Sequence, residues 1–463
     1  MATASKVKIP GGTKILYGIA DVGLALEQSV VQFFLLFYFT DIAKINPAIA
    51  ATALMVSKLT WDAVNDPLFG WWSDRTKSRW GRRRPFMFLA AVPMGLAFWL
   101  MFSLPQGLTG FIAFLAVLGT YLLFDTFHTM ISMAYYAMTA EMTTDYEERT
   151  SITATRMIFS IVGYILGAAV TTIIVGLFGS LLGWTNNASW SGMGLAFGVL
   201  SMLVVLTTAF SVRRKPVVNT KPSEIPPISA VVKTLRNKPF IKFLIATGLA
   251  SIAFTLITSL LPYYLIYQLD MSAELPIVMF AMLGTIAIFL FPTKLLSDRI
   301  NKGPAYAIGL IVASLAIIGT FLLPHHSTPI IYIIAVVAGI GFAGQYVFPG
   351  SMIPDVVEID EIQTGERREG LYFGIWSFIG KLTGALGIAI SGWALAGFGY
   401  QEGVAQTPTA LLGIRLFFSL IPAIILIAST PLLFRYPITK ESHAQLVKKL
   451  SKLPESAESQ GSK

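Results

Sequence analysis

The stretch WDAVNDPLFGWWSDR (61–75) closes a long apolar run and ends in the triplet Ser73-Asp74-Arg75. The same triplet closes another apolar run at 297–299. The charged stretch EMTTDYEERT (141–150) likewise has a counterpart in PDVVEIDEIQTGERREG (354–370). Because these landmarks recur in the same order, the sequence indicates two structurally related halves.

Each half consists of apolar runs that are long enough for transmembrane helices, since a helix needs about 20 residues to cross a bilayer. The chain is 54% hydrophobic and 13% charged, with a mean hydropathy of +0.68, whereas soluble domains carry about 25% charged residues. It has no cysteine, which excludes disulfides and thiol catalysis. We count twelve such runs, at 15–38, 47–72, 84–104, 108–140, 152–179, 190–211, 239–267, 275–296, 304–323, 329–354, 370–397 and 410–434.

The repeat and the runs together predict an all-α integral membrane protein with twelve transmembrane helices. This layout is typical of the major facilitator superfamily fold. Lys and Arg concentrate in three loops and at both termini, so both termini are expected in the cytoplasm. The same distribution explains the net charge of +9, and we expect no nucleic-acid partner. The predicted segments are a six-helix bundle 1–211, a cytoplasmic linker 212–238, a six-helix bundle 239–436 and a cytoplasmic tail 437–463.

Two carboxylates lie inside the second predicted span. Asp62 and Asp66 are four residues apart, so they share one face of a helix. Ionisable groups inside a membrane are costly to insert and are functional candidates by default. The repeat offset maps them to Ile286 and Leu290 in the other half, which are apolar. A symmetric scaffold would not need charges in one half only. This asymmetry favours a function over a scaffold role.

Two interpretations of this pair follow from its neighbours. Lys58 lies one turn before Asp62, and a Lys58–Asp62 ion pair would make the group structural. Alternatively, the carboxylates and the Asn65 amide supply the oxygen ligands that a hard cation prefers. Because two close carboxylates repel, one of them binds a cation or takes a proton. The second interpretation makes this the site of a driving ion.

Further polar groups recur at helical spacing on other predicted spans. Such stripes join helices, but carboxylates, amides and aromatic rings also suit sugar hydroxyls and the flat face of a sugar ring. Arg156 and Lys381 are intramembrane cations that need partners, for which Asp125 and the Asp62/Asp66 pair are candidates; both cations could also receive an acidic group of a solute. We expect the solute pocket to be lined by Asp21, Gln28, Gln32, Asp125, Tyr136, Arg156, Gln345, Tyr346, Trp376 and Lys381.

Charged loops on the cytoplasmic side repeat in both halves. Isolated surface charges contribute little to stability, but the repetition favours inter-loop ion pairs that latch one end of the molecule. The predicted gating residues are Arg75, Asp145, Glu148, Arg149, Asp355 and Arg368, with Arg82 and Arg83 as neighbours.

Several of these stretches resemble the glycoside–pentoside–hexuronide:cation symporters, a family that includes melibiose permease. The resemblance covers nearly the whole chain and rests on YGIADVG, FFLLFYFTD, WDAVNDPLFGWWSDRTKSRWGRRRPF, DYEERTSITATRM, PDVVEIDEIQTGERREGLYFGIWSF and GKLTGALG. It implies a cation site, for Na⁺, Li⁺ or H⁺, at Asp62, Asn65, Asp66 and Thr129, with Asp62 and Asp66 as the metal ligands if the ion is Na⁺. It also matches Arg156 and Lys381 to a family arginine and lysine.

The sugar-binding positions depart from that pattern. The permease's two sugar carboxylates fall at Ala25 and Ser132 here, with Asp21 and Asp125 one and two turns earlier, and its neighbouring tryptophan falls at Tyr136. The permease's galactoside specificity is therefore not expected to carry over. Vertebrate lysophospholipid symporters also resemble this family, which leaves a lipid-like solute open.

The sequence thus predicts a secondary active transporter that couples Na⁺ or H⁺ to symport of a sugar, glycoside or sugar acid by alternating access. The alternative is cation-coupled transport of a lysophospholipid or other amphiphile. The chain carries no HExxH or GxSxG motif and no phosphate-binding glycine loop, so we expect no enzyme. Apart from the coupling ion we expect no cofactor. The expected partners are a small polar solute, the cation and the lipid bilayer, for a monomer in a bacterial inner membrane.

Overall fold

The computed structural model describes residues 9–76, 78–143, 145–211, 231, 234–324, 328–364 and 368–440, and within them it contains helices and no strand. Most of the predicted linker and tail lies outside these residues. The first helices are α1 (Gly11–Gly18), α2 (Ala20–Phe37), η1 (Tyr38–Ile42), α3 (Pro47–Thr60), α4 (Asp62–Arg75), α5 (Arg84–Met101), α6 (Gly110–Met142), α7 (Tyr146–Leu182) and α8 (Asn186–Ser211). They are followed by α10 (Lys238–Tyr263), η2 (Tyr264–Gln268), α11 (Leu275–Ile300), α12 (Lys302–Thr320), α13 (Thr328–Thr364), α14 (Glu369–Gly397), α15 (Pro408–Arg415), η3 (Leu416–Leu420) and α16 (Ile421–Phe434).

Eleven helical segments of the described chain are long and apolar enough to cross a membrane. The run predicted at 47–72 is not one of them, because the chain divides there into α3 and α4, of 14 residues each. Asn46 starts α3 by accepting the backbone N–H groups of Ala48 and Ile49 at 3.0 and 3.4 Å. The division falls at Trp61, immediately before the carboxylate pair. The second predicted span is therefore not one continuous apolar helix, and its polar residues follow the division.

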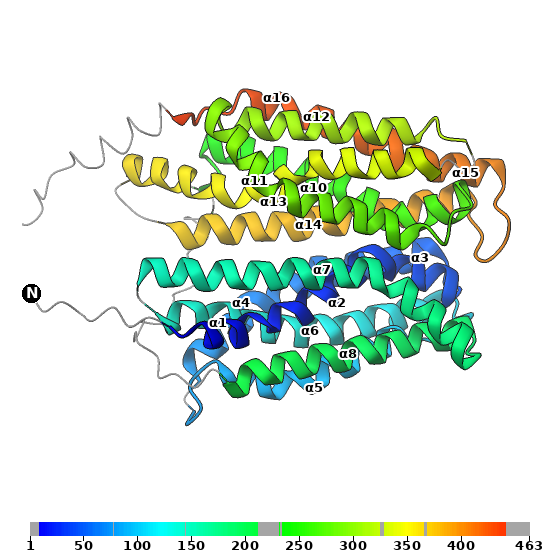
Figure 1. Ribbon diagram of the computed structural model, residues 1–463, viewed down its shortest axis with the longest axis horizontal. Helices are drawn as coiled ribbons and strands as arrows, with labels where there is room; N and C mark the ends of the chain where they lie inside the picture. Colours follow the sequence, from blue (N-terminus) through cyan, green and yellow to red (C-terminus); the bar gives the residue numbers. More distant parts are fainter. Residues whose placement is uncertain are drawn as a thin grey trace, which may run out of the picture.

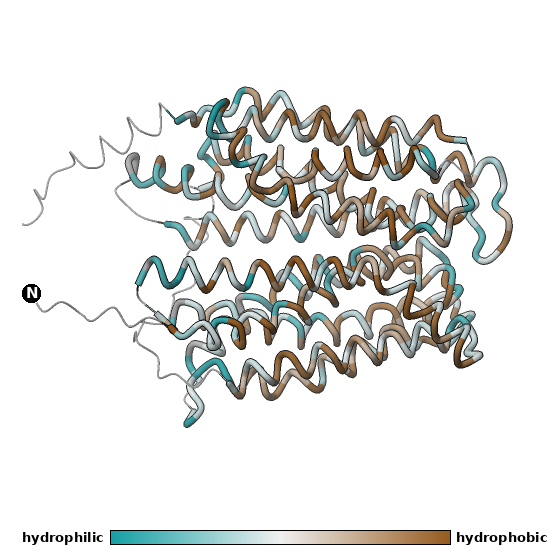
Figure 2. The backbone as a smooth tube through the Cα atoms, viewed as in Figure 1, coloured by the Kyte–Doolittle hydropathy of each residue, from teal (hydrophilic) through white to brown (hydrophobic). Residues whose placement is uncertain are grey.

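The helices lie roughly parallel in two groups (Figure 1). We call α1 to α8 the N-terminal half and α10 to α16 the C-terminal half. The groups meet where α2 contacts α10, α3 contacts α14 and α7 contacts α11. Hydrophobic residues dominate the middle of the helices and hydrophilic residues their two ends (Figure 2). This is the distribution that a protein needs when it spans a lipid bilayer.

One end of the molecule, which we call the tyrosine end, joins the two halves directly. The π-turns η1 and η2 follow α2 and α10, which are equivalent helices of the two halves. Asp41 in η1 accepts hydrogen bonds from the hydroxyls of Tyr267 and, at 2.5 Å, Tyr400. Thr40 and Tyr263 are also hydrogen-bonded, at 2.6 Å. A carboxylate of one half is thus held by hydroxyls of the other.

A close helix contact reinforces this junction. A Cβ atom added to Gly392 on α14 would lie 2.6 Å from the carbonyl oxygen of Pro47 on α3, so only glycine allows this approach. The next residue, Trp393, donates its indole N–H to Thr52 at 3.0 Å. The halves are therefore packed backbone to backbone near the tyrosine end.

The opposite end, which we call the charged end, is arranged differently. Five ion pairs between described residues of this end each join elements of a single half, and most are partly exposed. They are Lys14–Glu148 at 2.9 Å, Arg82–Glu141 at 2.6 Å, Arg83–Glu141 at 3.2 Å, Lys302–Asp355 at 2.7 Å and Arg368–Asp360 at 2.7 Å. A sixth and more exposed pair, Lys294–Asp298 at 2.5 Å, lies within α11.

Candidate functional site

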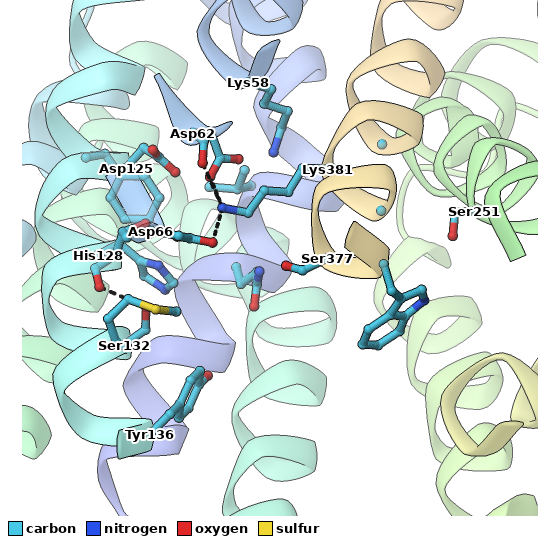
Figure 3. Close-up of a pocket in the computed structure, with 18 of the residues that line it drawn as sticks. Lys58, Asp62, Asp66, Asp125, His128, Ser132, Tyr136, Ser251, Ser377 and Lys381 are labelled. Carbon is cyan, nitrogen blue, oxygen red and sulfur yellow. Dashed lines mark hydrogen bonds and ion pairs between the residues drawn. The ribbon is translucent and has the colours of Figure 1, made fainter. Parts of the chain in front are cut away.

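A cavity of about 510 Å³ lies between the two halves. Residues of α2, α3, α4 and α6 form one wall, and residues of α10, α13 and α14 form the other. Its size is within the range of small-molecule sites, roughly 300–1,000 Å³. Figure 3 shows charged and hydroxyl groups from both halves facing it.

Asp62 and Asp66 point into this cavity from the first two turns of α4, and a lysine from the other half lies between them (Figure 3). The Lys381 ammonium is 2.5 Å from Asp62 Oδ1 and 2.9 Å from the Asp62 carbonyl oxygen, and it also pairs with Asp66. Four-residue spacing places both carboxylates on one helix face, so a single cation can contact both. The two carboxylates and a backbone carbonyl thus already surround one positive charge.

Asn65 lies on α4 between these carboxylates and is fully buried. Its amide nitrogen donates to Asp125 Oδ2 on α6 at 2.5 Å. Its carbonyl oxygen Oδ1 is buried and has no hydrogen-bond partner in the described structure. Such an oxygen costs free energy unless it is satisfied. Thr129, one turn after Asp125, also lines the cavity.

The alternative structural pairing predicted for Lys58 is not formed. The Lys58 ammonium lies 5.3 Å from the centroid of the Tyr121 ring, and Asp62 pairs with Lys381 instead. The predicted pairing of Lys381 with Asp62 and Asp66 is confirmed.

The other cation predicted to need a partner is Arg156. The expected pairing of Arg156 with Asp125 is wrong, because Arg156 pairs with Asp21 at 2.9 Å. Its guanidinium also lies against the rings of Tyr135 and Tyr136, 4.7 and 4.5 Å from their centroids. Asp21 in turn accepts from the Tyr135 hydroxyl at 2.8 Å. These groups satisfy one another beside the cavity.

The predicted pocket residues divide into two groups. Six of them line the cavity: Gln28, Asp125, Tyr136, Gln345, Trp376 and Lys381. Four are not in its wall: Asp21, Gln32, Arg156 and Tyr346. Gln32 accepts from the Tyr164 hydroxyl at 2.7 Å and donates to Thr258, so it joins helices. The Tyr346 ring packs edge-on against Phe254.

Other lining residues were not predicted from the sequence. Ser377, Gly380 and Gly384 line the cavity with Lys381 at helical spacing on α14, and Thr247 and Ser251 do so on α10. Small and hydroxyl residues at three- and four-residue spacing in the motif GKLTGALG were the available signal. The aromatic residues Tyr121 and Phe124 had no such signal, because rings are common throughout apolar helices.

The predicted gating residues have separate local roles at the charged end. Asp145 caps α7 by accepting the Glu148 N–H at 3.0 Å, and Glu148 pairs with Lys14. Arg149 donates to the Thr143 carbonyl at 3.3 Å, and Arg75 lies 4.3 Å over the Trp71 ring. Asp355 and Arg368 belong to the ion pairs with Lys302 and Asp360.

Comparison with known proteins identifies the family to which this chain belongs. A family model described as MFS/sugar transport protein matches residues 16–440, which is most of the chain. The protein belongs to this family. This MFS/sugar transport protein is therefore a membrane symporter and not an enzyme, and the predicted all-helical major facilitator fold is confirmed.

Several symporters and transporters are similar in sequence to this chain over most of their length. An uncharacterized symporter of Synechocystis, sll1374, is 28% identical over 96% of this chain and 97% of its own. A sodium-dependent lysophosphatidylcholine symporter of Gallus gallus is 25% identical over 98% and 92%, and an isoprimeverose transporter of Lactiplantibacillus pentosus is 25% identical over 90% and 87%. In fold, the chain is similar to a bacterial homologue of the lysosomal transporter Spinster, with a TM-score of 0.65, 13% identity and coverage of 95% and 97%.

Proposed function

We propose that this MFS/sugar transport protein couples Na⁺ to the uptake of a neutral sugar or glycoside. The observations that carry the ion site are the carboxylates of Asp62 and Asp66 around Lys381 and, on the same turn of α4, the unpartnered Oδ1 of Asn65. Oxygen ligands of this kind suit a hard cation. The relative described as sodium-dependent supports Na⁺, with Li⁺ and H⁺ as the other candidates.

The cavity wall favours a sugar over a lipid. Gln28, Gln345 and Tyr136 supply hydrogen-bonding groups from both halves, and Trp376 supplies a flat apolar face. The similar isoprimeverose transporter points to the same solute class. The lysophosphatidylcholine symporters keep an amphiphile as the second candidate.

Charge distinguishes a neutral sugar from a sugar acid. Arg156 is paired with Asp21 outside the cavity wall, and Lys381 is paired with two carboxylates. While Lys381 lies between the two carboxylates, neither cation can receive a carboxylate of the solute without breaking an existing pair. A neutral solute needs no such exchange, so we place sugar acids after neutral sugars.

The site also gives a mechanism for coupling. Na⁺ takes the place of the Lys381 ammonium between Asp62 and Asp66, which releases a contact between α4 and α14 and thus between the halves. The six-helix bundles 1–211 and 239–436 then rock around the occupied cavity, joined by the linker 212–238. We place the charged end and both termini, including the tail 437–463, in the cytoplasm of a bacterial cell, as the distribution of Lys and Arg indicates.

Counterflow of labelled neutral glycosides, hexuronides and lysolipids in vesicles, with and without Na⁺, tests this function. We expect Na⁺-stimulated counterflow of a neutral glycoside. Asp62→Asn and Asp66→Asn should abolish Na⁺-driven accumulation and retain some exchange. Counterflow of lysolipids alone, or full accumulation by both variants, contradicts the proposal.

Labelling of single cysteines tests the orientation, since the chain has no native cysteine. Cysteines at Ser103 and Gly399 should react with an impermeant reagent added outside cells, and one at Ser78 should not. The reverse pattern would reverse the orientation.

A further inference from the structure

Asp125 was predicted as a solute-binding residue, but its carboxylate accepts a hydrogen bond from a member of the proposed ion site. The Asp125 carboxylate accepts from Asn65 Nδ2 at 2.5 Å, across the contact between α6 and α4. Both side chains are buried, Asn65 completely and Asp125 with 8% of its surface exposed. Hydrogen bonds to a charged acceptor are stronger than neutral ones, by roughly a factor of two.

This bond fixes which way the Asn65 amide faces. A carboxylate can only accept, so the atom of Asn65 nearest Asp125 must be the NH₂ group. The carbonyl oxygen Oδ1 must then point the other way. That oxygen is buried without a partner, on the turn of α4 that carries Asp62 and Asp66.

We infer that Asp125 is a positioning residue for the coupling ion: it turns the Asn65 amide so that Oδ1 is presented to Na⁺ beside Asp62 and Asp66. The inference rests on the proposed ion site and assigns to Asp125 a role other than contact with the solute. If the amide were free to turn, it would present its NH₂ group to the ion for part of the time, and the ion would lose a ligand.

The placement of Asp125 explains why α6 contributes to a site on α4. Without an acceptor on α6, the Asn65 NH₂ group would have no buried partner and its orientation would no longer be specified. Asp125 and Thr129 face the cavity one turn apart on α6, so the helix both orients one ligand and lines the site.

Calorimetric Na⁺ binding to purified Asp125→Ala and Asp125→Asn proteins tests the inference. An asparagine at 125 can still accept from Asn65, whereas alanine cannot. We expect Asp125→Ala to weaken Na⁺ binding by about tenfold, the effect of roughly 1.4 kcal/mol, and Asp125→Asn by about threefold at most. Thr120→Ala, on the same helix but outside the cavity wall, is the matched control and should leave Na⁺ affinity unchanged.

A double-mutant cycle separates positioning from a general effect on the fold. Once Asn65 is replaced by alanine, adding Asp125→Ala should weaken Na⁺ binding no further, because the bond is already lost. Additive losses overturn the inference. Equal weakening by Asp125→Asn and Asp125→Ala overturns it too, since charge alone would then be responsible. Loss of glycoside affinity with unchanged Na⁺ affinity returns Asp125 to the solute site.

Na⁺ binding to wild-type protein and to Asp62→Asn tests the proposed ion site separately from the positioning role of Asp125. If wild-type protein binds neither Na⁺ nor Li⁺, or Asp62→Asn still binds Na⁺ normally, the proposed ion site itself is wrong. If Asp62→Asn abolishes binding and Asp125→Ala does not weaken it, only the positioning role is wrong.

Discussion

The two ends of the molecule hold their charges in different ways. At the tyrosine end, Asp41 of the N-terminal half is bound by Tyr267 and Tyr400 of the C-terminal half. At the charged end, the ion pairs Lys14–Glu148 and Lys302–Asp355 each remain within one half. The first arrangement holds the halves together, and the second shapes each half by itself.

The difference shows which contacts must break when the halves move. Separating the tyrosine end breaks bonds to a carboxylate, each contributing roughly 1.5–3 kcal/mol. Separating the halves at the charged end leaves the pairs Lys14–Glu148 and Lys302–Asp355 intact. Between the two ends, the contact of Lys381 with Asp62 and Asp66 crosses the halves and can be exchanged for a free cation. This structure is therefore a conformation closed at the tyrosine end.

The largest effect is expected from Asp41→Ala. It removes the acceptor of two tyrosine hydroxyls, so the tyrosine end should open more often, by at least about 100-fold in population, because two such bonds contribute roughly 3–6 kcal/mol together. The measurement is the labelling rate of a cysteine at Ser251, in the cavity wall, by an impermeant reagent added at the tyrosine end. Asp41→Asn, which keeps an acceptor oxygen, should change the rate less. An unchanged rate in Asp41→Ala would show that the hydroxyl bonds do not hold this end closed.

A smaller change in the same direction is expected from Gly392→Ala. Its new methyl group would meet the Pro47 carbonyl at 2.6 Å, and such overpacking costs about 1–3 kcal/mol. The same labelling rate should rise by roughly tenfold. Gly397→Ala on the same helix is the matched control, since a Cβ atom there meets nothing within 4 Å. Equal rates in the two variants would mean that the α3–α14 contact can relax.

The smallest effect is expected at the charged end. Lys302→Ala removes the pair with Asp355, which is partly exposed and lies within one half. Partly exposed pairs contribute about 0–1 kcal/mol, so the labelling rate at Ser251 should stay within about threefold of wild type. Lys294→Ala, which removes the more exposed pair with Asp298, serves as the control. A change as large as that of Asp41→Ala would remove the distinction between the two ends.

The sequence predicted the fold because membrane helices are long and apolar, and because the halves repeat. It located Asp62 and Asp66 because a charge inside an apolar run is rare. It failed for Arg156, whose partner Asp21 is 135 residues away in the chain, since spacing along one helix carries no information about the helix beside it. The sequence did not single out Asp41 for the same reason: it ends an apolar run as many loop residues do, and its partners Tyr267 of η2 and Tyr400 after α14 are far away in the chain.

The position of Lys381 in the ion site affects the net charge that the empty transporter carries. With both carboxylates ionised and Na⁺ absent, Lys381 leaves the group of Asp62, Asp66 and itself with one net negative charge instead of two. Moving one charge through 100 mV of membrane potential takes about 2.3 kcal/mol. The built-in ammonium therefore halves the electrical work when the empty carrier returns, and the turnover rate should depend correspondingly less on voltage.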